Sequence, residues 1–169
     1  YHSYYFTCGL ETTAMMIEHS KYSGDKTFQE TVLVPYAREV LLFFDKHYPR
    51  DENDKLRIDP GMVLETWWIA VNPAPDIAGL QFCLDELLAM KAGTDADRKN
   101  WRRFRAEIPP IHLREINGRK AIAPAKEWKP GWSGLCANWH PRRNSIDGNP
   151  QTNPRQRNCS GGGFPPLYF

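Results

Sequence analysis

Residues 22–48, YSGDKTFQETVLVPYAREVLLFFDKHY, contain the pattern that decides the fold. Large apolar side chains recur in this stretch at steps of four, and two leucines widen the row into a stripe. The stripe consists of Phe28, Val32, Tyr36, Val40, Phe44 and Tyr48, joined by Leu33 and Leu41. A stripe of this width predicts a long helix that packs against other helices. Pro35 is expected to kink that helix or to begin its second half.

A second helix is predicted before this stretch, over residues about 8–22, with Leu10, Ala14 and Ile17 on one face. Between the two helices stands Ser23-Gly24-Asp25. Glycine suits the left-handed conformation that ends a helix, and aspartate suits the N-cap of the next one.

Two further helices are predicted downstream, over residues about 76–90 and about 95–107. The first places Ile77, Leu80, Leu84, Leu87 and Leu88 inward, and the second buries Trp101 and Phe104. Thr94-x-x-Asp97 is a variant of the capping box, and Pro109-Pro110 stops the last helix. Residues 111–124 then predict a small β-hairpin that turns at Asn117-Gly118.

The connection between the helical pairs is long and rich in proline and aromatic residues. Residues 49–58 are polar, and residues 59–68, DPGMVLETWW, are followed by Asn72-Pro73-Ala74-Pro75. Prolines at this density exclude a continuous helix. Long ordered connections of this kind are disproportionately functional.

The composition excludes several classes of protein. A net charge of +2, with a nearly neutral body, argues against nucleic acid as a partner. No apolar run is long enough to cross a membrane. The four cysteines include no Cys-x-x-Cys pair, and Cys136, His140 and Cys159 lack an evident fourth ligand, so we expect no metal and no cofactor.

The chain predicts a body over residues 1–130 and an irregular tail over residues 131–169. From residue 136 on, the tail contains almost no aliphatic side chains and many Gly, Pro, Asn and Arg. Three interpretations of the tail remain: a disordered segment, a shifted reading frame, and a basic arm that binds RNA. The RNA-binding arm ranks last. The first residue is Tyr1, so an initiator has been removed or the beginning is missing, and the compartment is not predicted from this end.

Residues about 8–125 resemble part of the (α/α)6-toroid glycoside hydrolases, in particular glycoside hydrolase family 95 of the α-L-fucosidase type and its uncharacterised relatives. The resemblance lies in the helix-to-helix turn at residues 22–28 and in the helix from Tyr36 through Phe44. It extends to Pro60 and Glu65, which stand at the spacing of a proline and a catalytic glutamate in that family, and to the Asn117-Gly118 turn. Val63-Leu64 replace the family's Ser-Pro, and Thr66 replaces its Asn, so substrate identity does not carry over.

The resemblance implies a mainly α-helical fold of paired helices from part of an (α/α)6 toroid, with a small hairpin. It implies an inverting glycosidase with Glu65 as the general acid, a carbohydrate substrate, and secretion or a periplasmic location for the parent enzyme. Such an enzyme needs one carboxylic acid for the departing oxygen and a second carboxylate that activates water. The apolar residues around Glu65 favour its protonated form near neutral pH.

Other residues near Glu65 are candidates for contact with a sugar. Trp67 and Trp68 are adjacent, so at most one of them lines a pocket. Asn72 and Asp76 are candidates for hydrogen bonds to sugar hydroxyls, although Asp76 is more simply the N-cap of the next helix. Asp59 is either a second acid or, more simply, a turn residue.

The sequence contains no convincing general base, so the chain is predicted to be an incomplete enzyme with negligible hydrolysis alone. Alternatives are a non-catalytic helical module that binds proteins and an inactive relative that binds glycans. A helical interaction module predicts an internal repeat of roughly 34–47 residues, and the sequence shows none. His19, His47 and His112 are expected to be surface or helix-end residues without chemistry.

Overall fold

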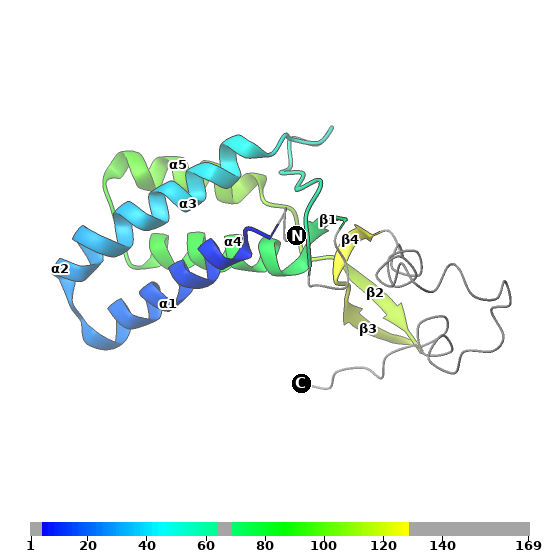
Figure 1. Ribbon diagram of the computed structural model, residues 1–169, viewed down its shortest axis with the longest axis horizontal. Helices are drawn as coiled ribbons and strands as arrows, with labels where there is room; N and C mark the ends of the chain where they lie inside the picture. Colours follow the sequence, from blue (N-terminus) through cyan, green and yellow to red (C-terminus); the bar gives the residue numbers. More distant parts are fainter. Residues whose placement is uncertain (1–4, 64–68, 129–169) are drawn as a thin grey trace, which may run out of the picture. The chain divides into compact units, whose positions relative to one another are not determined.

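The computed structural model describes residues 5–63 and 69–128 (Figure 1). The chain divides into two units, Tyr1–Trp128 and Lys129–Phe169. The second unit, which contains the predicted irregular tail, lies outside the described residues. The first unit is mainly helical and contains two antiparallel sheets of two strands each, as the sequence predicts for the fold class and for one of the sheets.

The helices and strands have the following bounds. The helices are α1 (Thr7–Ser23), α2 (Lys26–Phe28), a π-helical segment (Gln29–Leu33), α3 (Val34–His47), α4 (Ala74–Ala89) and α5 (Asp95–Glu107). The strands are β1 (Ala70–Pro73), β2 (Leu113–Ile116), β3 (Arg119–Ile122) and β4 (Ala125–Trp128).

The turn after α1 has the predicted caps. Gly24 adopts a left-handed conformation with φ of 67°, and its N–H donates to the Ser20 carbonyl at 3.0 Å. Asp25 is the N-cap of α2, and its carboxylate accepts the backbone N–H of Phe28 at 2.9 Å. Both predictions made from Ser23-Gly24-Asp25 are therefore confirmed.

The prediction of a continuous apolar stripe after this turn is partly wrong, because the helix contains a π-helical turn at Gln29–Leu33. Such a turn takes more residues than an α-helical turn, so side chains four residues apart no longer share a face across it. Val32 is accordingly 41% exposed, whereas its neighbour Leu33 is fully buried. Pro35 stands in the first turn of α3 and begins the second half of the helix, as predicted.

The helices form two αα-hairpins. In the first hairpin, α1 and α3 are antiparallel: a Cβ on Gly9 would lie 3.3 Å from Val40 Cγ1, and the rings of His19 and Phe28 are 4.6 Å apart at the other end. In the second hairpin, α4 and α5 are antiparallel and joined by an ion pair between Arg105 and Asp85 at 2.8 Å.

The two hairpins lie side by side in the same direction (Figure 1). Thr7 of α1 contacts Asp76 of α4, and Lys21 further along α1 contacts Glu86 further along α4, at separations of 69 and 65 residues. Arg38 and Asp45 of α3 likewise contact Asp97 and Arg103 of α5, at separations of 59 and 58 residues. In both pairs of helices, a later residue of one helix contacts a later residue of the other. This order shows that α1 packs parallel to α4 and that α3 packs parallel to α5.

The core lies between the two hairpins. It contains the residues predicted to face inward from α1, α4 and α5, except that Ala14 and Leu88 are only partly buried. Fully buried large side chains in this core include Leu10, Ile17, Leu33, Phe44, Ile77, Leu80, Leu84 and Leu87. The same core buries Leu56 and Ile58, two apolar residues of the polar segment that follows α3.

The strands form two separate pairs. β2 and β3 make the predicted hairpin, with positive φ values of 52° at Asn117 and 73° at Gly118 in the turn. β1 and β4, which the sequence analysis does not predict, pair antiparallel with Ala70 opposite Trp128 and Pro73 opposite Ala125. β1 therefore lies within the proline-rich connection.

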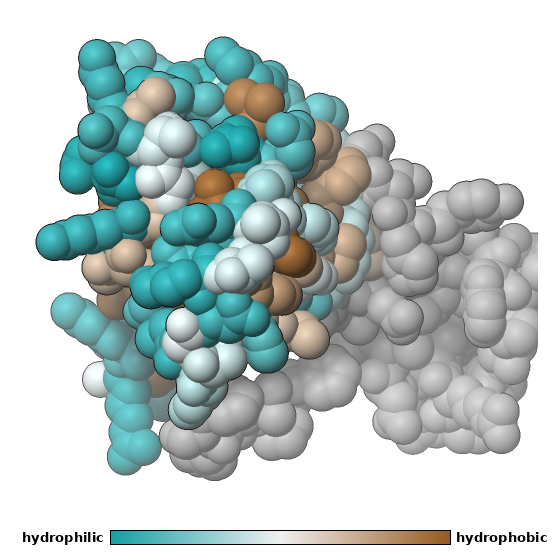
Figure 2. All heavy atoms as spheres, turned by 90° about the vertical axis from the view of Figure 1, so that its left-hand side faces the viewer, coloured by the Kyte–Doolittle hydropathy of each residue, from teal (hydrophilic) through white to brown (hydrophobic). Residues whose placement is uncertain are grey.

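The two ends of the helices differ. At one end the chain reverses through short turns at Gly24-Asp25 and at residues 90–94. This end, which faces the viewer in Figure 2, is largely hydrophilic, with apolar residues only in small groups. At the other end α1 and α4 begin, and the connection 48–73 and the segment that contains β2, β3 and β4 follow α3 and α5. Within the described residues no helix is long and apolar enough to cross a membrane.

Candidate functional site at the start of α1 and α4

The structure describes two of the predicted site residues. Glu65, Trp67 and Trp68 lie outside the described residues, whereas Asn72 and Asp76 are within them. Both described side chains are buried, with exposed fractions of 3% for Asn72 and 2% for Asp76. They flank the end of the connection, where β1 leads into α4.

Asn72 closes the connection by two hydrogen bonds to one residue. Its backbone N–H donates to the Ile58 carbonyl at 2.9 Å, and its Oδ1 accepts the Ile58 N–H at 2.7 Å. Asn72 has a φ of 50°, in the left-handed region that asparagine tolerates better than most residues. The Asn72 side chain therefore holds residue 58 against residue 72.

A second pair of hydrogen bonds lies one step further into the connection. The N–H groups of Gly61 and Ala70 each donate to the other residue's carbonyl, at 2.7 and 2.9 Å. A side chain at Gly61 would not fit, because a Cβ would lie 2.5 Å from Pro73 Cγ. Residues 62–69, which include Glu65, thus stand between two segments whose backbones are hydrogen-bonded to each other.

Asp59 pairs with Arg57 at the same place. The Arg57 guanidinium donates to Asp59 Oδ2 at 2.7 Å, and both side chains are about one-third exposed, at 36% and 35%. Asp59 precedes a cis peptide bond to Pro60. The Asp59 side chain therefore forms an ion pair with a residue two positions before it in the chain.

Asp76 is not the N-cap of α4, and that prediction is wrong. The N-cap is Pro73, which offers no side-chain cap, and Asp76 is the third residue of the helix. Its Oδ1 instead accepts a hydrogen bond of 2.5 Å from the hydroxyl of Thr7, the first residue of α1. The aspartate faces a neighbouring helix because α1 and α4 begin side by side.

Burial dominates the electrostatics of this position. It raises the pKa of Asp76 to about 7, against the opposing effect of the hydrogen bond from Thr7, and the charge of Glu11 raises it further. Burial, with the charge of Asp76 as a second cause, also raises the pKa of Tyr48 to about 12. The pKa of Tyr5 is raised by burial and by Glu11, whose carboxylate lies 3.5 Å from the Tyr5 hydroxyl. Acidic groups therefore gather at the start of α1 and α4.

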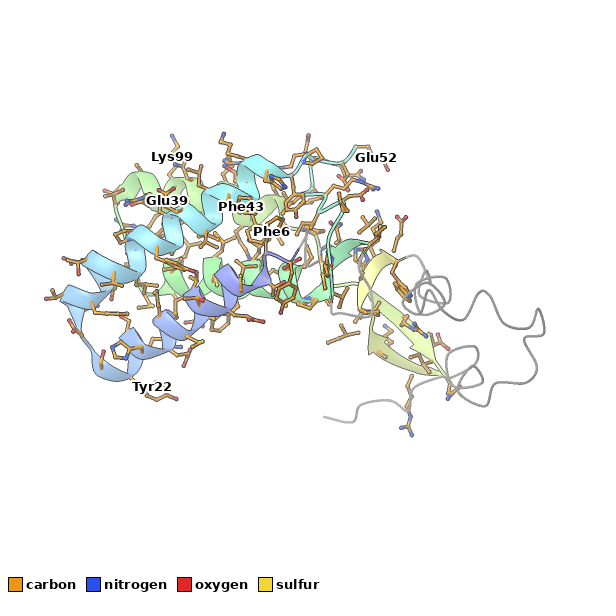
Figure 3. All side chains as sticks on the ribbon, in the orientation of Figure 1. Phe6, Tyr22, Glu39, Phe43, Glu52 and Lys99 are labelled. Atoms are coloured by element: carbon orange, nitrogen blue, oxygen red, sulfur yellow. The ribbon has the colours of Figure 1, made fainter. Side chains whose placement is uncertain are left out.

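An aromatic group lies beside these acids. The Phe6 and Phe43 rings meet edge to face at 4.8 Å (Figure 3), and His47 stacks on Phe43 at 4.7 Å. Tyr48 contacts His47 edge to face at 4.7 Å. Sequence reasoning placed Tyr48 in the helical stripe and did not connect it with Asp76, because no local pattern links a residue after α3 to one in α4.

The histidines divide into two groups. His19 and His47 are exposed, as predicted for surface residues. His112 differs: it is partly buried, and its Nε2 is buried without a hydrogen-bond partner among the described residues. Burial, together with the charge of Lys126, lowers the pKa of His112. The prediction for His112 is therefore wrong.

An acid with a pKa near 7 can exchange a proton in the neutral range, which is the property required of general acids and bases. The burial of Asp76 and its bond to Thr7 nevertheless direct this carboxyl into the fold. Within the described residues no three His, Cys, Asp or Glu side chains are grouped so as to hold a metal ion. No protein-family model, curated protein or solved structure matches this chain.

Proposed function

We propose that this chain is part of a glycoside hydrolase that cleaves glycosidic bonds with inversion, with Glu65 as the general acid. The proposal rests on the resemblance of residues about 8–125 to the (α/α)6-toroid enzymes. One structural observation carries it further, namely the parallel alignment of the two αα-hairpins.

Parallel hairpins differ from an up-and-down bundle, in which neighbouring helices are antiparallel. Repeating the step from the first hairpin to the second produces a ring or a solenoid of αα-hairpins. The apolar character of α4 and the highly charged sequence of α5 suit an inner and an outer helix, respectively. We infer that the two hairpins form part of an (α/α)6 toroid.

The proposed acid belongs to the connection between α3 and α4. The described parts of this connection are hydrogen-bonded to each other, Gly61 to Ala70 and Ile58 to Asn72. A general acid must be held within reach of the departing oxygen, so a connection closed at its base suits the role. In this proposal Trp67 or Trp68 forms a wall against the sugar ring. Asn72 and Asp76 are buried in internal hydrogen bonds, so in this proposal Asn72 supports the connection and Asp76 supports the start of α1, and neither contacts the substrate.

An inverting hydrolase also needs a carboxylate that activates water on the opposite face of the sugar. In this proposal a part of the toroid that this chain does not include supplies that base. The purified chain should therefore show negligible hydrolysis of aryl glycosides. Hydrolysis at ordinary enzyme rates that is lost in Glu65→Gln would overturn the proposed incompleteness and would leave the role of Glu65 intact.

Binding of sugars tests the proposal without requiring turnover. The experiment is a titration of tryptophan fluorescence with a panel of neutral oligosaccharides, in the wild type, in Glu65→Gln and in Glu52→Gln. Glu52 is exposed in the segment after α3 (Figure 3), so its substitution is a matched control for the loss of one carboxyl.

The three outcomes separate the candidate functions. A saturable response that Glu65→Gln alters and Glu52→Gln does not alter supports the glycosidase. A response that is the same in all three proteins indicates an inactive glycan-binding relative. No response to any sugar contradicts both, and favours the helical protein-interaction module.

A further inference from the structure

The start of α1 is joined to the start of α4 by a buried hydrogen bond between side chains. Thr7 is 4% exposed and Asp76 is 2% exposed, and the Thr7 hydroxyl lies 2.5 Å from Asp76 Oδ1. Neither helix has a side-chain N-cap, since Phe6 and Pro73 occupy the two cap positions. The Thr7–Asp76 bond therefore links two first turns that no capping side chain holds.

Among the described residues, the titratable groups that interact electrostatically with Asp76 are acidic or phenolic. Glu11 lies one turn after Thr7 on α1, Tyr5 precedes α1, and Tyr48 follows α3. The electrostatic effect on Asp76 from a described residue comes from Glu11 and disfavours a negative charge. Burial without a cationic partner disfavours the charged carboxylate, because the charge loses the water that solvates it.

We propose that the Thr7–Asp76 pair is a proton-controlled latch, which holds the first turn of α1 on α4 while Asp76 is protonated and releases it when Asp76 loses its proton. The hydrogen bond from Thr7 favours the charged form, but burial outweighs it. Water stabilises the charged carboxylate more than the single hydroxyl of Thr7 does. Water reaches the carboxylate when the first turn of α1 moves away.

The direction of the pH dependence follows from the shift. Burial raises the pKa of Asp76 in the folded chain from 3.8 to about 7. The protonated form therefore stabilises the fold fully below the unfolded value, and this stabilisation is lost as the pH rises through about 7. The latch is closed in mild acid and open in mild alkali.

Hydrogen exchange of the backbone amides, measured from pH 5.5 to pH 8.5 and corrected for the intrinsic rate, tests this proposal. In the full wild-type chain, protection in the first turns of α1 should fall by about tenfold across this range, while the first turn of α5 keeps its protection. Asp76→Asn should show no such fall, because its amide oxygen still accepts from Thr7 but the group does not ionise. Glu11→Gln removes a negative charge that raises the pKa of Asp76, so it should move the midpoint to lower pH.

Equal pH dependence in the wild type and Asp76→Asn would overturn the latch. If Asp76→Asn does not fold, Thr7→Val replaces it, and low protection of α1 at every pH is the expected result. A wild-type fall in protection that includes α5 equally would also overturn the latch, since it would report global loosening. None of these readouts depends on sugar binding, so the latch and the proposed glycosidase fail independently.

Discussion

At the scale of single residues, Asn72 joins the two ends of the connection through its backbone and its side chain. Its φ of 50° is left-handed, so substitution by glycine and by alanine separates the contribution of the side-chain oxygen from that of the backbone conformation. Glycine adopts this conformation without strain but has no amide oxygen, whereas alanine lacks the oxygen and is strained as well.

Asn72→Gly should therefore destabilise the fold by about 1–3 kcal/mol, because the buried N–H of Ile58 loses its acceptor. Asn72→Ala should cost roughly 1 kcal/mol more. Urea unfolding of the three proteins measures both steps. An unchanged free energy of unfolding in Asn72→Gly would show that the side chain contributes no net stability.

The burial of Tyr48 leads us to expect that the fold loses stability in alkali. Burial raises its pKa to about 12, so the folded chain keeps the phenolic proton that the unfolded chain releases near the ordinary value of 10.0. The stabilisation is complete below pH 10 and is lost as the pH rises toward about 12. Tyr48→Phe, which has no proton to lose, should become less sensitive to pH over this range in unfolding experiments followed by circular dichroism.

Tyr22 provides the control for this experiment, since it is 88% exposed and points away from the helices (Figure 3). Tyr22→Phe should keep the alkaline loss of the wild type. If Tyr48→Phe keeps it too, Tyr48 is not the group responsible.

At the scale of elements, the start of α5 shows how local and distant contacts combine. Asp97 forms the predicted capping box with Thr94, whose N–H and hydroxyl both lie 2.8 Å from Asp97 Oδ2. The same carboxylate accepts two hydrogen bonds from the Arg38 guanidinium of α3, at 2.8 and 2.9 Å. These bonds lower the pKa of Asp97, with Arg38 as the largest cause.

Asp97→Ala should therefore cost about 2 kcal/mol at neutral pH, because it removes a cap and a charge-assisted pair together. The wild-type advantage is present above the unfolded value of 3.8 and declines as the pH falls below it. Thermal unfolding at pH 7 and pH 2.5 measures this change. Asp95→Ala is the control, since Asp95 is fully exposed and its pair with Arg98 should contribute little.

Elements with short-range signatures were predictable from the sequence, and elements made by distant pairing were not. The capping box at Thr94 and the turn at Asn117-Gly118 depend on neighbouring residues. The β1–β4 pair joins a segment that precedes α4 in the sequence to one that follows α5. In addition, Pro73 in β1 is unusual for a strand. The π-helical turn at Gln29–Leu33 has no sequence pattern that distinguishes it from a continuous helix.

The candidate site divides in the same way. The positions of Asn72 and Asp76, at the end of the connection and in the first turn of α4, follow from their place in the sequence. Their partners Ile58 and Thr7 do not, because contact between Thr7 and Asp76 requires the parallel packing of two hairpins, which spans 69 residues. For the same reason the sequence suggested a cap for Asp76 where the structure has a contact between helices.

At the scale of the whole molecule, the close approach of α1 and α4 determines how the hairpins align. A Cβ on Gly79 would lie 3.1 Å from the Leu10 side chain, so the absence of a side chain at this position permits the contact. Gly79→Val should push the hairpins apart and destabilise the fold by about 1–3 kcal/mol, despite the higher helix propensity of valine.

Ala89→Val, at an exposed position of the same helix, is the matched control and should change stability by less than about 0.5 kcal/mol. Urea unfolding compares the two variants. Equal effects in both would contradict close packing of the hairpins at Gly79.

Glu65 is proposed as a general acid, and the titration of its own carboxyl tests this role without knowledge of the substrate. The measurement is the pH titration of the side-chain carboxyl resonances in the chain labelled with ¹³C-glutamate, with Glu65 assigned from its absence in Glu65→Gln. A general acid for glycoside hydrolysis holds its proton near neutral pH, so the pKa of Glu65 should lie clearly above those of the exposed glutamates. Titration of Glu65 in the same pH range as the exposed glutamates would contradict the assignment.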